Sequence, residues 1–250
     1  ASAAKPIIIK AETVGGVILT GSSHFVFKKS AHLTLEGFVI DGKGDDTLVK
    51  LEGCNNIRIS RNIFELEAED AVKWVYIGGY WDDYDFNFLS HSNRVDHNIF
   101  QNKSTAGNYI TIDGTKNEDE TILQQSQYDR IDHNYFKNNQ PRIANEKESI
   151  RIGWSEMSQS SGFTIVEFNL FENCDGDPEI ISVKSCDNTI RHNTFSKSYG
   201  TLSLRHGNRS RVEGNYFFGD GKANGTFETS TLYTGGIRIY GTDHVIVNNY

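Results

Sequence analysis

The sequence predicts an all-β protein with the fold of a right-handed single-stranded parallel β-helix, forming one domain over residues 1–250. A short motif recurs along the chain, in which an apolar residue is followed three positions later by Asn and five positions later by Phe. The asparagines of successive copies are 22 to 36 residues apart, a period typical of solenoids. Helical periodicity is nearly absent, which favours strands throughout.

The copies of the motif predict the coils of the solenoid. Each copy is a β-prone alternation closed by Asn, which tolerates left-handed turns and can bond to its own backbone. We expect the asparagines to stack as an internal ladder and the phenylalanines to stack in the core. The complete copies contain Asn62 and Phe64, Asn98 and Phe100, Asn134 and Phe136, Asn169 and Phe171, Asn193 and Phe195, and Asn215 and Phe217.

The two ends of the chain differ from the middle. A degenerate copy of the motif near Gly37 comes first, and Asn249 with Tyr250 begins a copy that the last residue interrupts. We therefore expect a domain cut at both ends from a longer chain. The longer coils leave room for loops over 80–90 and 114–127, which we expect to line a groove where aromatic residues stack on sugar rings. The alternative is that these loops are decoration.

Composition disfavours several classes of function. With 33 Asp and Glu against 25 Lys and Arg, the chain is not expected to bind nucleic acid or membrane surfaces. No apolar run reaches the roughly 20 residues of a membrane span, and no signal peptide is visible. The cysteines Cys54, Cys174 and Cys186 are too few for a disulfide framework, so we expect them to be buried as small apolar residues.

Residues suited to catalysis gather between Cys174 and Gly207. Two short apolar strands, over 180–183 and 201–204, end on Lys184 and Arg205, and His206 follows. Lys184 and Arg205 precede the Asn of their own coils by nine and ten residues, so we expect them at nearly the same place on neighbouring strands, about 4.8 Å apart.

Arg151 and Arg238 extend this pair to a predicted row of outward-facing cations. Arg238 precedes the Asn of its coil by eleven residues, and Arg151 alternates outward within its own strand. On an acidic protein such a row is the basic strip that an anionic polymer needs. The alternative is a row of ordinary solvated charges.

Oxygen-bearing side chains accompany the cations. Asp177 and Glu179 fall on one face of an extended segment, and with Asn145 and Glu148 they are ligands of the kind that Ca²⁺ prefers. They could instead neutralise the cations as ion pairs. Glu179 and Lys184 are five residues apart, so they share a site only if a bulge interrupts the strand.

The chain resembles polysaccharide lyase family six, the alginate lyases that also include chondroitinase B, over essentially its whole length. The resemblance is carried by NEKESIRIG (145–153), DGDPEIISVKS (175–185), LRHGNRSRVEGNYF (204–217) and GGIRIYGTDHVIVNNY (235–250). It implies a lyase that acts on 4-linked uronic-acid polymers, most simply alginate, with dermatan or chondroitin sulfate as the alternative. It further implies that Lys184 is the general base and Arg205 the general acid or charge stabiliser.

The resemblance also assigns ligands and a setting. It implies calcium held by Asn145, Asp177 and Glu179, and we expect a secreted or periplasmic bacterial enzyme. The expected substrate-binding residues are His206, Arg151, Arg238 and Tyr240.

Two departures from the family pattern concern calcium. Asp177 stands where the family usually has Glu, and residues 145–148 read Asn-Glu-Lys-Glu in place of Asn-Gly-Gly-Glu. Lys147 could therefore put an ammonium at the calcium position and replace the ion. The alternative is an exposed lysine in a charged turn.

The chemistry of uronates predicts β-elimination. The C5 proton becomes acidic when the C6 carboxylate is neutralised, a base removes that proton, and an acid protonates the departing O4. The product is a 4,5-unsaturated sugar, and water, Tyr240 or Tyr233 would supply the last proton. The rival hypotheses are a glycoside hydrolase that uses Asp175, Asp177 and Glu179, and a non-catalytic solenoid that binds a polyanionic polysaccharide.

Overall fold

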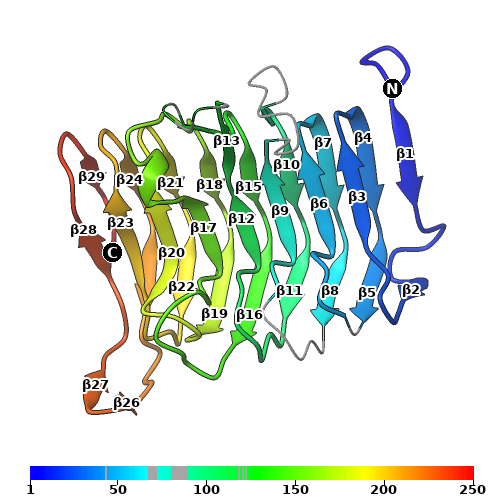
Figure 1. Cartoon of the computed structure of the whole chain (residues 1–250). Helices are drawn as coiled ribbons and strands as arrows, with labels where there is room; N and C mark the ends of the chain where they lie inside the picture. Colours follow the sequence, from blue (N-terminus) through cyan, green and yellow to red (C-terminus); the bar gives the residue numbers. More distant parts are fainter. Residues whose placement is uncertain (43, 67–71, 80–88, 118, 120, 122) are drawn as a thin grey trace.

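The computed structural model of the chain is a parallel β-helix, which confirms the predicted fold class (Figure 1). It describes residues 1–42, 44–66, 72–79, 89–117, 119, 121 and 123–250. Three long sheets run along the axis of the solenoid, and every strand in them pairs in parallel with strands of the neighbouring coils. Within the described ranges the 3-10 helix η2 (Ser155–Met157) is the only helix. No described helix is long and apolar enough to cross a membrane.

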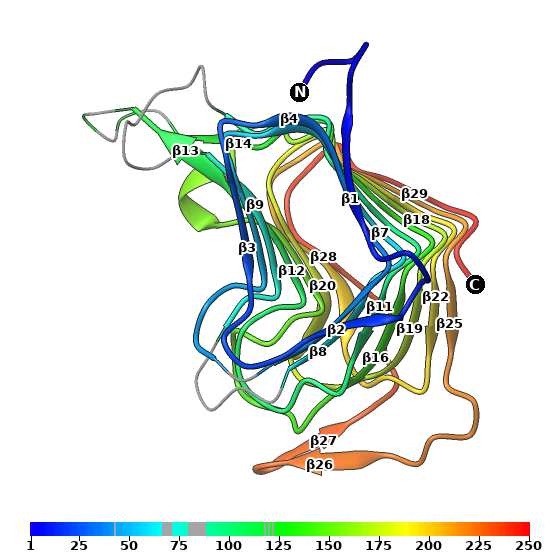
Figure 2. The same ribbon diagram turned by 90° about the vertical axis from the view of Figure 1, so that its right-hand side faces the viewer.

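The three sheets enclose a central core, as the view along the axis shows (Figure 2). The first sheet consists of β1 (Ile7–Lys10), β4 (Ala31–Glu36), β7 (Asn55–Ser60), β10 (Arg94–Asp96), β15 (Arg130–Asp132), β18 (Ile165–Glu167), β21 (Thr189–Arg191), β24 (Arg211–Glu213) and β29 (Val245–Val247). The second sheet consists of β2 (Val17–Leu19), β5 (Phe38–Gly42), β8 (Ile63–Leu66), β11 (Ile99–Gln101), β16 (Tyr135–Asn139), β19 (Leu170–Cys174), β22 (Thr194–Ser196) and β25 (Tyr216–Phe218). The third sheet consists of β3 (Phe25–Lys28), β6 (Val49–Glu52), β9 (Val75–Gly78), β12 (Ile110–Ile112), β17 (Ile150–Gly153), β20 (Glu179–Lys184), β23 (Thr201–His206) and β28 (Ile237–Ile239).

Two antiparallel hairpins project from the solenoid (Figure 2). One joins β13 (Gly114–Lys116) to β14 (Leu123–Gln125), and the other joins β26 (Gly225–Phe227) to β27 (Ser230–Leu232). The expected loop over 114–127 therefore contains the first hairpin. Of the other expected loop, residues 80–88 lie outside the described residues.

A ladder of buried asparagines lies between the first and second sheets, as predicted. The side-chain oxygen of Asn134 accepts hydrogen bonds from the backbone N–H and the side-chain amide of Asn98, both at 3.0 Å. The same amide contact links consecutive asparagines from Asn62 to Asn249. The left-handed residue of each turn is the one before Asn, such as His133 with φ 55°. The expectation that Asn itself adopts this conformation is wrong, because its side chain has to point inward to bond to the next coil.

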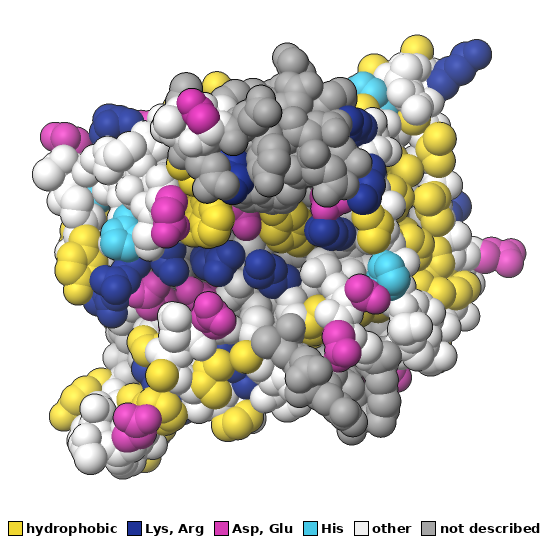
Figure 3. Space-filling model, viewed as in Figure 1, with side chains coloured by type: hydrophobic (Ala, Val, Ile, Leu, Met, Phe, Trp, Pro, Cys, Tyr) yellow, Lys and Arg dark blue, Asp and Glu magenta, His cyan; other side chains and the backbone are white. Residues whose placement is uncertain are grey.

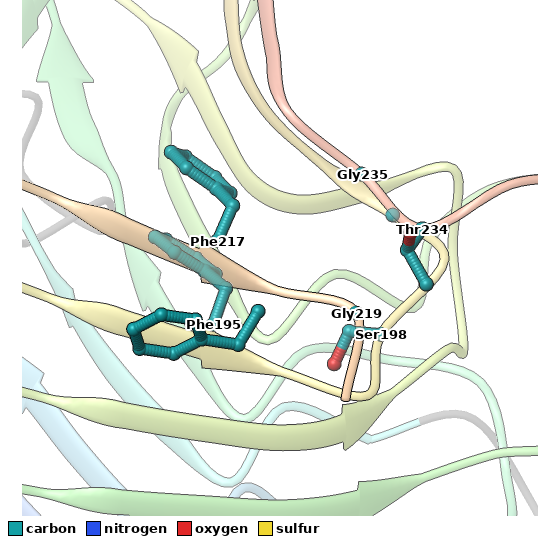
Figure 4. A pocket seen from close by; sticks show the side chains of 8 residues that line it. Phe195, Ser198, Phe217, Gly219, Thr234 and Gly235 are labelled. Atoms are coloured by element: carbon teal, nitrogen blue, oxygen red, sulfur yellow. The ribbon is translucent and has the colours of Figure 1, made fainter. Parts of the chain in front are cut away.

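The phenylalanines form the predicted stack beside this ladder. Ring centroids of neighbours from Phe64 to Phe217 are 4.6 to 5.0 Å apart. Figure 4 shows Phe195 and Phe217 beside a cavity of about 10 Å³, the size of one water molecule. The predicted burial of Cys54, Cys174 and Cys186 is also confirmed, and all three are free thiols.

Candidate active site

The outward face of the third sheet carries the charged residues of the candidate site. The register of the strands places Arg151, Ser182, Ser203 and Arg238 in one row across β17, β20, β23 and β28. Lys and Arg side chains follow this part of the surface in the space-filling view, with acidic side chains beside them (Figure 3). Arg151 and Arg238 therefore share a row, as predicted.

Lys184 and Arg205 lie beyond that row, at the ends of β20 and β23. The Cα partner of Lys184 is His206, and a bulge follows Val183 in the pairing. Lys184 and Arg205 therefore lie at nearly the same place on neighbouring strands, as expected, but one residue out of register, because β23 has an extra residue at this point. The bulge lets Arg205 and His206 both line one cavity with Lys184.

A second bulge lies at the start of β20, as a shared site required. Glu179 pairs with Thr201, whereas Ile181 pairs with Leu202, so Ile180 is the extra residue. Glu179 consequently lines the same cavity as Lys184, although the two are five positions apart. The cavity has a volume of about 350 Å³, and its lining consists of Ala144, Asn145, Ser155, Asp177, Pro178, Glu179, Lys184, Arg205, His206 and Arg238.

Glu148 is the carboxylate nearest to Lys184. Its Oε1 lies 3.7 Å from the Lys184 Nζ, and its Oε2 accepts a hydrogen bond of 2.6 Å from the Asn108 amide. The Thr111 hydroxyl in turn donates to the Asn108 side-chain oxygen at 2.8 Å. Glu148 is only 2% exposed, so this chain of contacts fixes where the Lys184 amine lies. The sequence grouped Glu148 with the calcium ligands, and its contact with Lys184 comes from pairing between coils.

Glu179 is the acceptor for the arginines. Its Oε1 accepts a hydrogen bond from Arg238 and lies 3.6 Å from Arg205 Nε, and the Ser182 hydroxyl donates to its Oε2. These contacts hold two guanidinium groups at the cavity. They are also the ion pairs that the sequence offered as the alternative to calcium binding.

Asp177 is buried and carries a perturbed carboxyl group. Its oxygens accept hydrogen bonds from the backbone N–H groups of Glu179, at 2.9 Å, and Lys147, at 3.2 Å. Burial, followed by the charge of Glu148, raises the pKa of Asp177 to about 7. The Asp177 carboxyl group therefore takes up a proton more readily than that of an exposed aspartate.

Lys147 does not line the cavity. Its ammonium donates hydrogen bonds to the carbonyl oxygens of Ser104 and Pro141, both at 2.9 Å, and the side chain is fully buried. The alternative of an exposed lysine in a charged turn is therefore wrong. Burial lowers the pKa of Lys147 to about 8, and it lowers that of the neighbouring Lys103 to about 7, with the charge of Lys147 contributing.

His206 faces the cavity next to Arg205. Its Nε2 is 3.3 Å from the hydroxyl of Ser155, a residue of η2 that the sequence did not indicate. Burial lowers the pKa of His206, and the charges of Arg205 and Lys184 lower it further. A neutral imidazole can donate or accept a hydrogen bond here, which suits a contact with a sugar hydroxyl.

The remaining expected residues lie at the edge of the cavity or away from it. Both Arg205 and Arg238 place their guanidinium carbon over the Tyr240 ring, 5.5 and 5.2 Å from its centroid. Arg151 Nη2 lies 4.0 Å from Asp113, toward the N-terminal end of the solenoid. Tyr233 is 64% exposed and does not line the cavity.

Asn145, Asp177 and Glu179 all line the cavity, and their side-chain oxygens are of the kind that a hard cation binds. Burial is the main cause of the raised pKa of Asp177, and the charge of Glu148 is the second cause. Among the residues that the structure describes, no three side chains of His, Cys, Asp and Glu form a metal cluster. A cation would thus need the Asn145 amide and oxygens of other origin, such as water or substrate.

The family described as Chondroitinase B matches residues 1–250. The solved structure of a mannuronic acid specific polysaccharide family 6 lyase from human gut microbiota is similar, with a TM-score of 0.80 and 30% identity over 100% of this chain and 53% of that one. The PL6 family alginate lyase AlyGC has a TM-score of 0.79 and 33% identity, over 100% of this chain and 32% of that one.

A third similar structure is the PL6 family polysaccharide lyase Pedsa3628 from Pseudopedobacter saltans. Its TM-score is 0.77 and its identity 26%, over 100% of this chain and 53% of that one. The present chain thus spans about half the length of two of these proteins and about a third of AlyGC. A comparison with curated protein sequences gives no match.

Proposed function

The chain belongs to the Chondroitinase B family, polysaccharide lyase family six, and from this premise we propose that it cleaves 4-linked uronic-acid polymers by β-elimination. The observation that carries the proposal is the meeting of Lys184, Arg205 and His206 in one cavity, opposite buried carboxylates. A glycoside hydrolase would use the carboxylates but would leave this cationic group without a role. Alginate is the proposed substrate, since two of the similar structures are described as a mannuronic acid specific lyase and an alginate lyase.

Lys184 is the proposed base. Its neutral amine accepts the proton from C5 of the uronate, the electron pair forms the C4–C5 double bond, and the C4–O4 bond breaks. Arg205, at the strand end beside Lys184, stabilises the negative charge that develops on the C6 carboxylate. A guanidinium does not give up its proton at neutral pH. The proton for the departing O4 is therefore assigned to water or to Tyr240, next to both arginines.

Arg238 and His206 are proposed to bind the substrate. Arg238 is held in place by Glu179, so its charge faces the cavity without needing to reorganise when an anionic sugar arrives. His206 is proposed to bond to a sugar hydroxyl, and Arg151 to bind a more distant carboxylate on the same face of the sheet.

Calcium is the proposed cofactor, held by Asn145, Asp177 and Glu179. When bound, it would neutralise the substrate carboxylate as a Lewis acid. The contacts of Lys147 with Ser104 and Pro141 support calcium over a lysine in this role, because the ammonium is already satisfied by carbonyl oxygens.

Chelation is expected to abolish activity. We expect a calcium chelator to reduce the rate of product formation by at least about 10²-fold, the scale of losing one electrostatic stabiliser, and added Ca²⁺ to restore it. The measurement is the initial rate with chelator, without it and after recalcification. Lys147→Met should show the same chelator response as the unmodified protein. Full activity in chelator would contradict the proposal of calcium as the cofactor. Loss of turnover in a folded Lys147→Met variant would indicate that Lys147 neutralises the substrate carboxylate instead.

The function itself is tested with two polymers. The protein is incubated with alginate and with dermatan sulfate, and the ultraviolet absorbance of the conjugated double bond in the unsaturated product is followed. Absorbance that rises with alginate supports the proposal, and a rise with dermatan sulfate alone would move the substrate to the sulfated alternative. Reducing ends formed without absorbance would indicate a hydrolase, and binding without any product would indicate a non-catalytic solenoid.

A further inference from the structure

A second and larger cavity opens on the outward face of the third sheet, toward the N-terminal end. Its volume is about 460 Å³, and it is lined by Thr47, Lys50, Lys73, Tyr76, Asp113 and Trp154. No residue of this lining enters the proposed reaction. Its mixture of cations and aromatic rings is nevertheless typical of a binding site for an anionic sugar.

The second cavity continues the face that carries the candidate active site. Tyr76 in β9 is in register with Thr111, Arg151 and Ser182 on the following strands. These are three strand spacings, or about 14 Å. At the junction, Trp154 lines the second cavity, and its chain neighbour Ser155 lines the first. A polymer that lies across the sheet from the first cavity would therefore reach the second.

Lys73 is the cation of this cavity that forms no ion pair with another described residue. Its ammonium lies 5.6 Å from the centroid of the Tyr76 ring, and within the described residues no carboxylate is within 4 Å of it. Lys50, in contrast, forms an ion pair with Glu52. Burial lowers the pKa of Lys73 and the charge of Arg151 lowers it further, while the charges of Asp113 and Glu146 oppose this shift only in part. An anion bound in the cavity would favour the charged form of Lys73 and so offset both effects.

Asp113 is the carboxylate of the cavity lining, and its charge acts on both Lys73 and Arg151. It is only 6% exposed, its carboxylate accepts a hydrogen bond from the backbone N–H of Gly114 at 2.9 Å, and Arg151 lies 4.0 Å away. Burial raises the pKa of Asp113, and the charge of Arg151 opposes that shift. The described lining thus holds two lysines, Lys50 and Lys73, against the single carboxylate of Asp113, and Arg151 lies beside that carboxylate.

We propose that this second cavity is a remote subsite, in which Lys73 binds the carboxylate of a uronate several sugars from the cleaved bond and Trp154 packs against a sugar ring. The inference rests on the proposed function, because it takes its ligand from the same polymer. A remote subsite makes the enzyme select for chain length, since an oligomer that fills both cavities gains binding energy that a short one cannot.

The test compares oligouronates of two lengths. For Lys73→Gln, we expect KM for a hexasaccharide to rise about tenfold, the scale of one lost charge-assisted contact. KM for a trisaccharide that occupies only the first cavity should change less than twofold. Lys10→Gln is the matched control, since it removes the same charge from an exposed position on the first sheet and should alter neither value.

Three results would overturn the inference. KM could rise equally for both lengths, which would place the effect of Lys73 in the first cavity or in the fold. KM could stay unchanged for both lengths, or the Lys10→Gln control could show the same length dependence. If the protein forms no unsaturated product, the proposed function fails, and calorimetric binding of the hexasaccharide then tests the subsite by itself. Weaker binding of the hexasaccharide by the Lys73→Gln variant than by the unmodified protein would support the subsite. Equal affinity of the two proteins for the hexasaccharide would refute it.

Discussion

Lys184→Ala is expected to lower turnover on alginate by about 10²–10⁴-fold, the usual loss for a general base. The amine is the proposed acceptor of the C5 proton, and Glu148 and Asn108 fix its position. Among the described residues that line the cavity, Lys184 is the only lysine, so none of them replaces it. The measurement is kcat from the absorbance of the unsaturated product, with circular dichroism to show that the variant is folded.

The Lys184→Arg variant tests whether Lys184 acts by accepting a proton or only by its positive charge. The guanidinium retains a positive partner for Glu148 but is not deprotonated at neutral pH, so we expect it to be nearly as inactive as Lys184→Ala. Lys197→Ala is the control from the same coil, because it removes an amine that is paired with Glu172 outside the cavity. If either Lys184 variant keeps more than about a tenth of the wild-type turnover, Lys184 is not the base.

The fold could be predicted because its two main contacts are made by identical residues in successive coils. Asn134 bonds to Asn98 and Asn169, and Phe136 stacks between Phe100 and Phe171. When a residue contacts its equivalents in neighbouring coils, the same residue type recurs at regular intervals in the sequence and can be recognised there. The left-handed residue before each asparagine cannot be recognised in this way, because its type varies from coil to coil, as in Arg61, His97 and Phe168.

The site could be predicted only where it depends on local spacing. Lys184 and Arg205 were located by their distance from the asparagines, but the bulge after Val183 shifts the pairing to His206. Such a shift is set by how two coils fit together, and neither strand shows it alone.

Contacts with other coils also decide where single lysines lie. Lys147 has acidic neighbours in sequence, yet its ammonium binds carbonyl oxygens of Ser104 and Pro141. The Lys73 ammonium lies over the ring of Tyr76, which is close to it in sequence, whereas Asp113 and Trp154 of the same cavity come from later coils. The second cavity therefore has no motif that could reveal it in the sequence.

The asparagine ladder should dominate stability, and Asn134→Leu tests it with a side chain of similar size. The Asn134 amide donates to Val95 O at 2.8 Å, Asp132 O at 3.1 Å and Asn169 Oδ1 at 3.0 Å. Its oxygen accepts two bonds from Asn98. Each buried group left without a partner costs about 1–3 kcal/mol, because no water replaces the lost contact. We therefore expect a loss of at least about 3 kcal/mol in the free energy of unfolding.

For a chain of this length a loss of that size corresponds to a fall of roughly 6–12 °C in Tm, measured by calorimetry. Asn55→Leu is the control, because that side chain forms one exposed hydrogen bond, with Asn56, and should change Tm by no more than about 2 °C. Because each coil of a solenoid contacts only its neighbours, the damage should be local, and hydrogen exchange should rise most in β10, β15 and β18. Equal Tm values for the two variants would show that packing of the phenylalanine stack, and not the amide ladder, holds the coils in register.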